Sequence, residues 1–196
     1  MADLKAFERE CEAFFGPLWP GEDKILVFGD GKSDHPDIML IGEAPGEQET
    51  LQRRPFVGKA GKNLDEFLAL MGMDRSALYV SNVVKIRPTA QGASGRVRNR
   101  APSKEEIALF LPFLMKEITL VSPQTLVTLG NVPLKALMGA NVTVGELHGQ
   151  WHTAANGLPL FALYHPAAII YRRELKPVYE QDVLALRESL TIQTSK

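Results

Sequence analysis

The stretch that decides the fold is DIMLIG at Asp37–Gly42, which runs directly into the turn EAPGEQE at Glu43–Glu49. A short, almost continuous apolar run that ends in glycine and proline is typical of a strand buried on both faces. Three further runs have the same character: LYVSNV at Leu78–Val83, QTLVTLG at Gln124–Gly130 and LPLFALY at Leu158–Tyr164. The sequence therefore predicts four buried strands.

Segments with helical periodicity lie before, between and after these strands. Apolar residues recur at intervals of three and four in four sets: Leu4, Phe7, Cys11 and Phe14; Leu64, Phe67, Leu68 and Met71; Ile107, Phe110, Leu111, Leu114, Ile118 and Val121; and Tyr179, Val183, Leu186 and Leu190. Ser103 and Glu106 form a capping-box pattern at the start of the third helix, and Pro112 is expected to kink or shorten it. This alternation predicts an α/β fold, a three-layer α/β/α sandwich with a central four-stranded, mainly parallel sheet.

The composition bounds the class of protein. The chain has 196 residues, of which 45% are hydrophobic and 23% charged, and its formal net charge is −1. These values predict one globular domain over residues 1–196. No apolar run is long enough to span a bilayer, and the start of the chain lacks the apolar core of a signal peptide. We therefore expect a cytoplasmic protein that acts as a monomer without membrane contact, and any nucleic-acid site must rest on a local basic patch.

Ligands of parallel sheets bind beyond the carboxyl ends of the strands, so the residues after each predicted strand are the candidates for a site. After the first strand, the segment Gly42–Gly46 (GEAPG) forms a tight turn whose backbone amides can point at a ligand. Glu43 stands at the strand end, where it is placed to hold a water molecule or the edge of a base. An ordinary turn with solvated acids explains this segment equally well.

Three other side chains follow predicted strand ends or lie in a glycine-rich segment. Phe56 lies in RPFVGKAG and is placed to stack on a flat ligand, although a loop phenylalanine more often fills the core. Asn82 offers a donor and an acceptor that suit the imide edge of a nucleobase, and the alternative is an amide satisfied by a nearby loop. His165 precedes a helix N-terminus, which disfavours the imidazolium. A neutral histidine there can donate to a developing anion, whereas a lone histidine is more often structural.

Together these segments resemble the uracil-DNA glycosylase superfamily, and within it the branch called family 4. GEAPGEQE resembles the first motif, RPFVGKAG the aromatic segment, SNVVKIRP the asparagine segment and HPAAIIYR the second motif, in the same order over about residues 36–190. The resemblance implies a four-stranded parallel sheet between helices. It also implies hydrolysis of the N-glycosidic bond of uracil in DNA, the first step of base-excision repair, with other deaminated bases as further substrates.

The resemblance assigns roles in the pocket residue by residue. Phe56 corresponds to the ring that stacks on flipped-out uracil, Asn82 to the amide that reads its edge, and His165 to the histidine that contacts a uracil carbonyl. Asn82 and His165 are therefore expected to take part in catalysis. The residues that shape the pocket are Gly42, Ala44, Pro45 and Gly46.

Activation of the attacking water is the open part of this assignment. Families with a strong water-activating aspartate place it where this chain has Ala44. Glu43, or as second choice Glu47, is therefore expected to orient the water. The segment Ala167–Arg172 corresponds to the loop that enters the duplex beside the extruded nucleotide, and its expected DNA contacts are Ala167, Ala168 and Arg172.

The branch normally holds a [4Fe–4S] cluster with four cysteines, and this chain departs from it. The corresponding positions are Cys11, Phe14, Ile86 and Phe110, and Cys11 is the only cysteine in the chain. One thiolate cannot hold a cluster, so we expect no metal and no cofactor. The three apolar side chains are expected to form a hydrophobic plug in the vacated volume, with Cys11 as a buried, inert thiol.

A basic loop between Pro88 and Pro102 is the second departure. The expected contacts with DNA phosphates are Lys85, Arg96, Arg98 and Arg100, while a solvated charged loop is the alternative. In an extended loop the three arginines share one face and Asn99 points away from them. A related branch traps uracil-DNA covalently through a histidine at the position of Asn99, so no covalent adduct is expected here.

Three functions compete for this sequence. The first is a monofunctional uracil-DNA glycosylase that binds uracil-containing DNA, because no lysine is placed for Schiff-base chemistry. The second is a protein that binds uracil or damaged bases with weak or no catalysis, since Ala44 replaces the strong base. The third, an unrelated small-molecule hydrolase, is disfavoured because the basic loop would serve no purpose in it.

Overall fold

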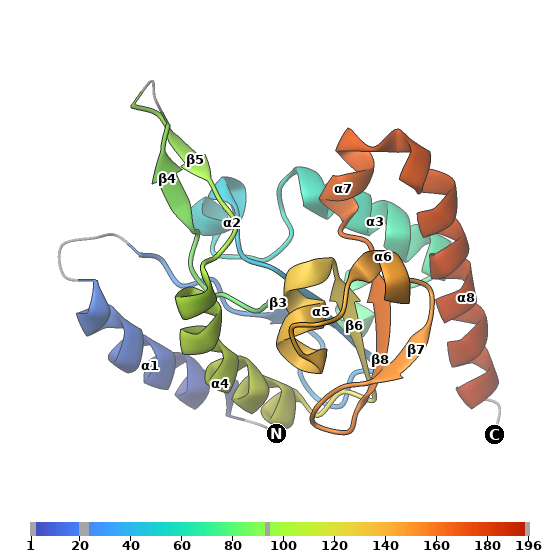
Figure 1. Ribbon diagram of the computed structural model, residues 1–196. Coiled ribbons are helices and arrows are strands. Elements are labelled where there is room, and N and C mark those ends of the chain that lie inside the picture. Colours follow the sequence, from blue (N-terminus) through green and yellow to red (C-terminus); the bar gives the residue numbers. More distant parts are fainter. Residues whose placement is uncertain (1–2, 20–23, 93–94, 195–196) are drawn as a thin grey trace.

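A twisted sheet forms the centre of the computed structural model, which describes residues 3–19, 24–92 and 95–194 (Figure 1). The sheet has six strands in the order β1-β3-β2-β6-β8-β7. The four predicted strands lie side by side in its middle and are parallel. They are β3 (Tyr79–Asn82), β2 (Ile38–Gly42), β6 (Thr125–Leu129) and β8 (Pro159–Leu163). The predicted three-layer α/β architecture with a mainly parallel sheet is confirmed.

Two short strands at the edges of the sheet were not predicted. β1 (Asp30–Gly31) pairs antiparallel with β3, and β7 (Trp151–Thr153) pairs antiparallel with β8. Both strands are too short to show a periodic apolar pattern, and the residues of β1 are polar or glycine. They cap the two outer edges of the four-stranded parallel centre, which would otherwise expose unpaired backbone groups.

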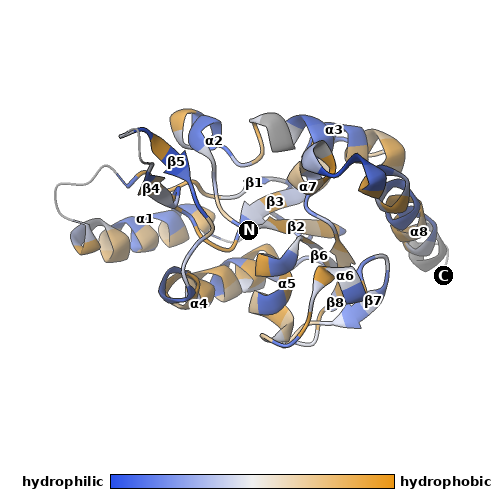
Figure 2. Ribbon diagram, turned by 45° about the horizontal axis from the view of Figure 1, so that its top comes forward, coloured by the Kyte–Doolittle hydropathy of each residue, from blue (hydrophilic) through white to orange (hydrophobic). Residues whose placement is uncertain are grey.

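Helices cover both faces of the sheet, and the hydrophobic residues of the central strands lie between the two helical layers (Figure 2). One face packs against α1 (Leu4–Phe15), α4 (Lys104–Val121), α5 (Asn131–Met138) and the single turn α6 (Val144–Leu147). The other face packs against α3 (Lys59–Met71) and α8 (Lys176–Thr194). Short helical segments complete the chain: α2 (Glu47–Gln52), α7 (Pro166–Tyr171), and the 3-10 turns Gly16–Leu18, Arg75–Ala77 and Arg173–Leu175.

Helix α4 begins as predicted but continues through its proline. The Ser103 hydroxyl accepts from the Glu106 amide at 3.2 Å, and the Glu106 carboxylate accepts from the Ser103 amide at 2.7 Å. Pro112 lies inside the helix, which runs on to Val121, so the proline does not shorten it, and the other expected effect, a kink, stays a prediction. Proline removes one backbone hydrogen bond, and the buried apolar face of α4 on both sides of it stabilises the helix sufficiently.

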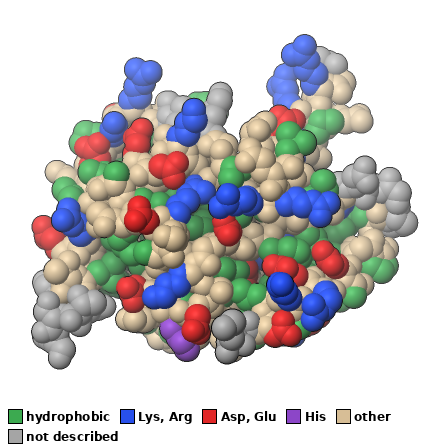
Figure 3. Space-filling model, turned by 180° about the vertical axis from the view of Figure 1, so that it is seen from behind, with side chains coloured by type: hydrophobic (Ala, Val, Ile, Leu, Met, Phe, Trp, Pro, Cys, Tyr) green, Lys and Arg blue, Asp and Glu red, His purple; other side chains and the backbone are tan. Residues whose placement is uncertain are grey.

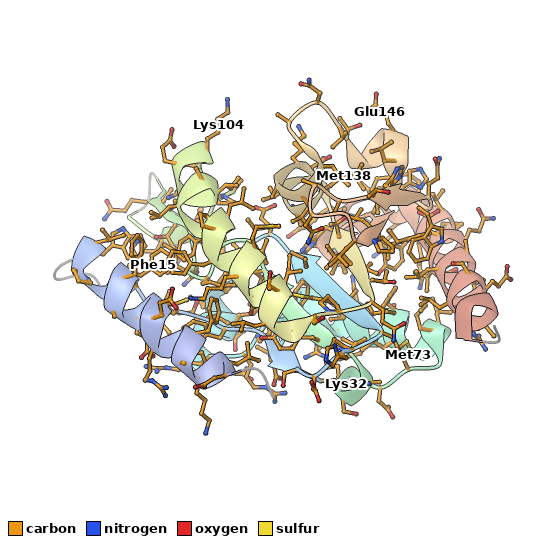
Figure 4. All side chains as sticks on the ribbon, turned by 90° about the horizontal axis from the view of Figure 1, so that it is seen from below. Phe15, Lys32, Met73, Lys104, Met138 and Glu146 are labelled. Atoms are coloured by element: carbon orange, nitrogen blue, oxygen red, sulfur yellow. The ribbon has the colours of Figure 1, made fainter. Side chains whose placement is uncertain are left out.

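The hydrophobic plug exists, with a different phenylalanine at its centre. Phe15 is buried and stacks on Phe110 with ring centroids 4.2 Å apart, between α1 and α4 (Figure 4). Ile86 is also buried, but 47% of Phe14 is exposed, so the prediction for Phe14 is wrong. The buried face of α1 repeats every four residues through Cys11 and Phe15, which turns Phe14 toward solvent.

The single cysteine behaves as expected for a buried thiol. Cys11 has no exposed surface, and burial raises the pKa of its thiol to about 12. The thiolate that iron requires is therefore strongly disfavoured. With apolar side chains at the other cluster positions, these residues do not fit a [4Fe–4S] cluster. Among the residues that the structure describes, no group of three or more histidine, cysteine or acidic side chains is arranged to hold a metal ion.

The basic loop, which was expected to be extended, folds into a two-stranded hairpin. β4 (Thr89–Gln91) pairs antiparallel with β5 (Val97–Asn99), and the hairpin projects from the body of the protein beside α2 (Figure 1). It stands at the same end of the molecule as α7, beyond the carboxyl ends of the central strands. Within the described ranges, no helix has both the length and the apolar character needed to cross a membrane.

Candidate active site

A cavity of about 510 Å³ lies at the carboxyl ends of the parallel strands. Its walls come from the turn after β2, the start of α3, the hairpin and α7. Six of its lining residues were predicted to contact the base or the DNA: Ala44, Gly46, Phe56, Asn82, His165 and Ala167. The structure therefore brings together side chains from four segments that are far apart in the sequence.

Asn82 presents a side-chain amide to this cavity. The residue is 3% exposed, and its side chain forms no hydrogen bond within the described part of the chain. A β-carbon on Gly42 would lie 2.5 Å from Asn82 Oδ1 and 2.5 Å from a ring carbon of Phe56. Glycine at this strand end is therefore what allows the amide and the aromatic ring to approach. The amide atoms are not among the buried polar atoms that lack a partner, so they are open to the cavity, where a ligand with complementary groups can bind them.

Phe56 has a backbone conformation that bulky residues rarely adopt. Its φ is +53°, in the left-handed region. Arg75 Nη2 donates to the Phe56 carbonyl, and Gly61 makes room for that carbonyl, since a β-carbon there would lie 2.0 Å from the oxygen. The Phe56 ring lies 6.2 Å from the His165 ring at an interplanar angle of 29°. The strained backbone of Phe56 is thus stabilised by the hydrogen bond from Arg75 and by the space beside Gly61, and strained residues of this kind are common at binding sites.

Glu49 was missed by the sequence reasoning, and it links two walls of the cavity. Its carboxylate accepts hydrogen bonds from the backbone amides of Gly46 (3.1 Å), Val57 (3.1 Å) and Gly58 (2.7 Å). It therefore ties the turn after β2 to the segment that carries Phe56. The position of an acid three residues after Gly46 is a sequence signal for helix capping. No sequence signal indicates that the same carboxylate also accepts from the amides of Val57 and Gly58.

His165 is neutral and has a defined tautomer. Its Nδ1 accepts from the Ala167 amide at 3.0 Å, which caps α7, so the ring proton is on Nε2. Burial lowers the pKa of the imidazole to about 4. Gly130, with a φ of +91°, directly follows β6, and a β-carbon there would lie 3.1 Å from the His165 Cβ. The ring can therefore donate from Nε2 without first taking up a proton.

The two candidate water-orienting acids differ in position. Glu47 lines the cavity, where its carboxylate pairs with Arg87 Nη1 at 3.2 Å. Glu43 is half-buried at the start of the turn and is not among the residues that line the cavity, and burial raises the pKa of its carboxyl group. Pro45 is buried in the same turn without lining the cavity. The assignment of the water to Glu43 or Glu47 stays a prediction.

The prediction that Lys85 contacts DNA is wrong. The Lys85 side chain has no exposed surface, and its ammonium lies 2.5 Å from the Glu117 carboxylate. The chain turns inward after Asn82, and the carboxylate that holds the lysine comes from α4. A run of basic residues in the sequence cannot reveal such a partner.

The arginines of the hairpin fall into two groups. Arg96 and Arg98 are exposed and form no ion pair within the described residues, and Figure 3 shows basic side chains on the projecting hairpin. Arg100 is engaged by both carboxylate oxygens of Glu106 at 2.6 and 2.7 Å, so its charge is largely compensated. Asn99 lines the cavity from the opposite face of β5, where its Oδ1 accepts from Arg87 at 2.7 Å.

The far wall of the cavity is α7. Ala167 lines the cavity and Ala168 is partly exposed in the first turn of the helix. Arg172 follows the helix and pairs at the surface with Glu174 at 3.0 Å. Tyr171, which the sequence reasoning did not single out, lines the cavity mouth with 85% of its surface exposed.

Comparison with known proteins gives consistent results. Residues 28–186 match the uracil DNA glycosylase superfamily. The chain is similar to the type-4 uracil-DNA glycosylase of Sulfurisphaera tokodaii, with 36% identity over 160 residues that cover 78% of this chain and 69% of the relative. It is also similar to that of Saccharolobus solfataricus, with 33% identity over 198 residues that cover 96% of this chain and 86% of the relative. The crystal structure of wild-type SMUG2 from Pedobacter heparinus has the same fold, with a TM-score of 0.58, 16% identity, and coverage of 95% and 84%.

Proposed function

Because the chain belongs to the uracil-DNA glycosylase superfamily, we propose that it is a monofunctional uracil-DNA glycosylase that hydrolyses the N-glycosidic bond of uracil in DNA. The relatives of similar length are named type-4 uracil-DNA glycosylases. The observation that carries the proposal to this chain is the unpaired Asn82 amide in a cavity that it shares with Phe56 and His165.

Recognition begins with extrusion of the nucleotide into the cavity. Unpairing and unstacking cost a few kcal/mol, and stacking on Phe56 offsets part of this. The Asn82 amide then accepts from uracil N3–H and donates to O4. Cytosine presents the opposite pattern at these two atoms, so the same amide orientation does not fit it. The base thus supplies hydrogen-bond partners for both ends of the Asn82 amide.

His165 acts on the leaving base. As the bond between C1′ and N1 breaks, its electrons pass to the uracil ring and the sugar gains oxocarbenium character. The Nε2–H of neutral His165 donates to the uracil carbonyl oxygen on which negative charge collects. A preorganised donor of this kind is worth about 2.7–4 kcal/mol of transition-state stabilisation. Water then adds at C1′ and leaves an abasic site.

An acid of the turn after β2 orients the attacking water. Glu43 is the first choice, because its carboxylate has no competing partner among the described residues, whereas Glu47 is paired with Arg87. Under single-turnover conditions Glu43→Gln is expected to slow excision more than Glu47→Gln. The reverse order would assign the water to Glu47.

The DNA backbone is held by the two walls that flank the cavity mouth. Arg96 and Arg98 on the hairpin are placed to contact phosphates on one side, and the α7 segment with Ala168 and Arg172 lies on the other. Such contacts position the duplex and leave base selection to the pocket. The enzyme is then proposed to act as a cytoplasmic monomer at the first step of base-excision repair, with other deaminated bases as further candidate substrates.

Release of free uracil over many turnovers tests this proposal. Purified protein is expected to release several equivalents of uracil from uracil-containing oligonucleotides without added cofactor. Asn82→Ala and His165→Ala are expected to lose most of the rate, while His35→Asn, which alters an exposed histidine outside the cavity, is expected to retain it. Tight binding of uracil DNA without turnover would favour the alternative, a base-binding protein.

A further inference from the structure

A buried cluster of polar side chains lies beneath β3, on the face of the sheet that α1 and α4 cover. Its centre is the ion pair between Lys85 and Glu117, both without exposed surface. Tyr79 and Ser81, which share one face of β3, donate to the two oxygens of the Glu117 carboxylate at 3.0 and 2.9 Å. The proposed reaction does not use this cluster. Because the desolvation of a buried ion pair offsets its attraction, such a pair is weak grounds for stability alone.

Lys85 makes one contact that reaches the site. Its ammonium donates to the Ser81 hydroxyl at 2.6 Å and to the backbone carbonyl of Asn82 at 2.7 Å. With Glu117, these acceptors account for all three of its donors. The contact falls at the last residue of β3, the residue whose side chain enters the cavity.

The sheet leaves this carbonyl without a strand neighbour on one side. β1 pairs with β3 at Tyr79 and Val80, and beyond Val80 the outer edge of β3 has no strand partner among the described residues. On the inner side, Asn82 pairs with Gly42 of β2. The Lys85 ammonium therefore donates the hydrogen bond that a neighbouring strand would otherwise donate to the Asn82 carbonyl.

We propose that Lys85 is a positioning residue that fixes the Asn82 peptide group, and through it the direction of the Asn82 amide, with Glu117 as the buried counter-charge. With the residues that the structure describes, the Asn82 side chain forms no hydrogen bond, so the direction of its amide depends on how firmly its backbone is held. This inference rests on the proposed uracil-DNA glycosylase reaction, in which that amide reads the base.

The test removes both charges together, because a single change would leave the partner charge buried and unpaired. The paired variant Lys85→Met/Glu117→Leu keeps comparable volume and removes the donor to Asn82. Its single-turnover excision of uracil is expected to fall about 10- to 100-fold, the scale that a small misplacement of a reacting group produces. Should this pair fail to fold, the neutral amide pair Lys85→Gln/Glu117→Gln is used in its place, because a shorter side chain withdraws the donor from Asn82.

Tyr79→Phe is the matched control. It removes a different hydrogen bond to the same Glu117 and leaves the contact between Lys85 and Asn82 intact. Its excision rate is expected to stay within about twofold of wild type, the range of independent effects. When the paired change is made in Asn82→Ala, the excision rate is expected to fall less than about twofold further. The paired change acts through the Asn82 side-chain amide, and that amide is already absent from this variant.

Three results would overturn the role of Lys85: wild-type excision by a folded paired variant, an equal loss in Tyr79→Phe, or an undiminished additional loss in Asn82→Ala. A carbon-13 label at the Asn82 carbonyl, assigned by its absence in Asn82→Ala, tests the contact without turnover. The signal is expected to shift in the paired variant and not in Tyr79→Phe, and an unchanged signal would refute the contact. Wild type that releases no uracil would refute the proposed function, whatever the label shows.

Discussion

The neutrality of His165 leads to a quantitative prediction about acid stability. The pKa of an ordinary histidine is 6.5, and burial lowers that of His165 to about 4 in the folded protein. Between these values the unfolded chain binds a proton that the folded chain does not. Stability from this group is therefore fully present above pH 6.5 and is lost as the pH falls toward 4. Between pH 7.5 and pH 4.5 the loss amounts to about 2–3 kcal/mol.

The perturbation is His165→Asn, which removes the titrating ring and keeps an oxygen that can cap α7 from the same position. Urea unfolding at pH 7.5 and pH 4.5, followed by tryptophan fluorescence, gives the free energy of unfolding of both proteins. Carboxylates elsewhere titrate equally in both and cancel in the comparison. Wild type is expected to lose about 2–3 kcal/mol more than the variant between the two pH values.

Excision supplies a second readout of the same protonation state. Because His165 is neutral throughout, the single-turnover rate of wild type should show no step near pH 6.5 that belongs to this residue. Equal pH dependence of stability in wild type and His165→Asn would refute the reasoning. A histidine signal with a pKa near 6.5 that disappears in the variant would refute it as well.

Three further predictions concern the walls, the hairpin and the core. Glu49→Gln replaces a carboxylate that accepts three backbone amides, so urea unfolding should show a loss of about 1.5–3 kcal/mol and excision should slow; unchanged values in both assays would contradict the link between the walls. Replacing Arg96 and Arg98 together by alanine should reduce the slope of log binding constant against log salt concentration by about 1.4 to 1.8 units, without altering the preference for uracil over thymine. The control Lys5→Ala should leave this slope unchanged. An unaltered slope in the arginine variant would show that the hairpin does not contact DNA. Phe110→Ala should lower the free energy of unfolding by about 3–5 kcal/mol. Wild type purified without oxygen should be colourless. Stoichiometric iron by metal analysis would refute the inference that apolar side chains fill the cluster position.

The parallel centre of the fold could be predicted because its strands are buried on both faces. A strand such as Ile38–Gly42 shows this as an uninterrupted apolar run, which is visible in the sequence alone. Residues at the ends of such strands converge by topology, so Asn82 and His165 could be expected in one place. The β4–β5 hairpin shows no such run, because its strands are short and largely exposed, and the segment was expected to be an extended loop without strand pairing.

The remaining differences concern partners that are distant in the sequence. Lys85 sits in a basic stretch, and nothing near it indicates that Glu117 will neutralise it in the core. In the sequence, Glu49 has the pattern of a solvated acid in a turn. In the structure, backbone amides of the segment after Phe56 donate to its carboxylate. Phe14 and Phe15 are adjacent, and small differences in the phase of α1 decide which of them is buried. In each case the outcome depends on packing between elements rather than on local pattern.

The cavity stands on the strand ends of one continuous sheet: Asn82 of β3 lines it, Gly42 of β2 packs against Asn82 and Phe56, and Gly130, directly after β6, packs against His165. A floor built this way has little freedom to adapt to a base that is still in the helix, so the DNA must undergo nearly all of the distortion. The rate of repair should then follow how readily each nucleotide leaves its helix. Uracil mispaired with guanine should be removed faster than uracil paired with adenine, and uracil in unpaired strands fastest of all.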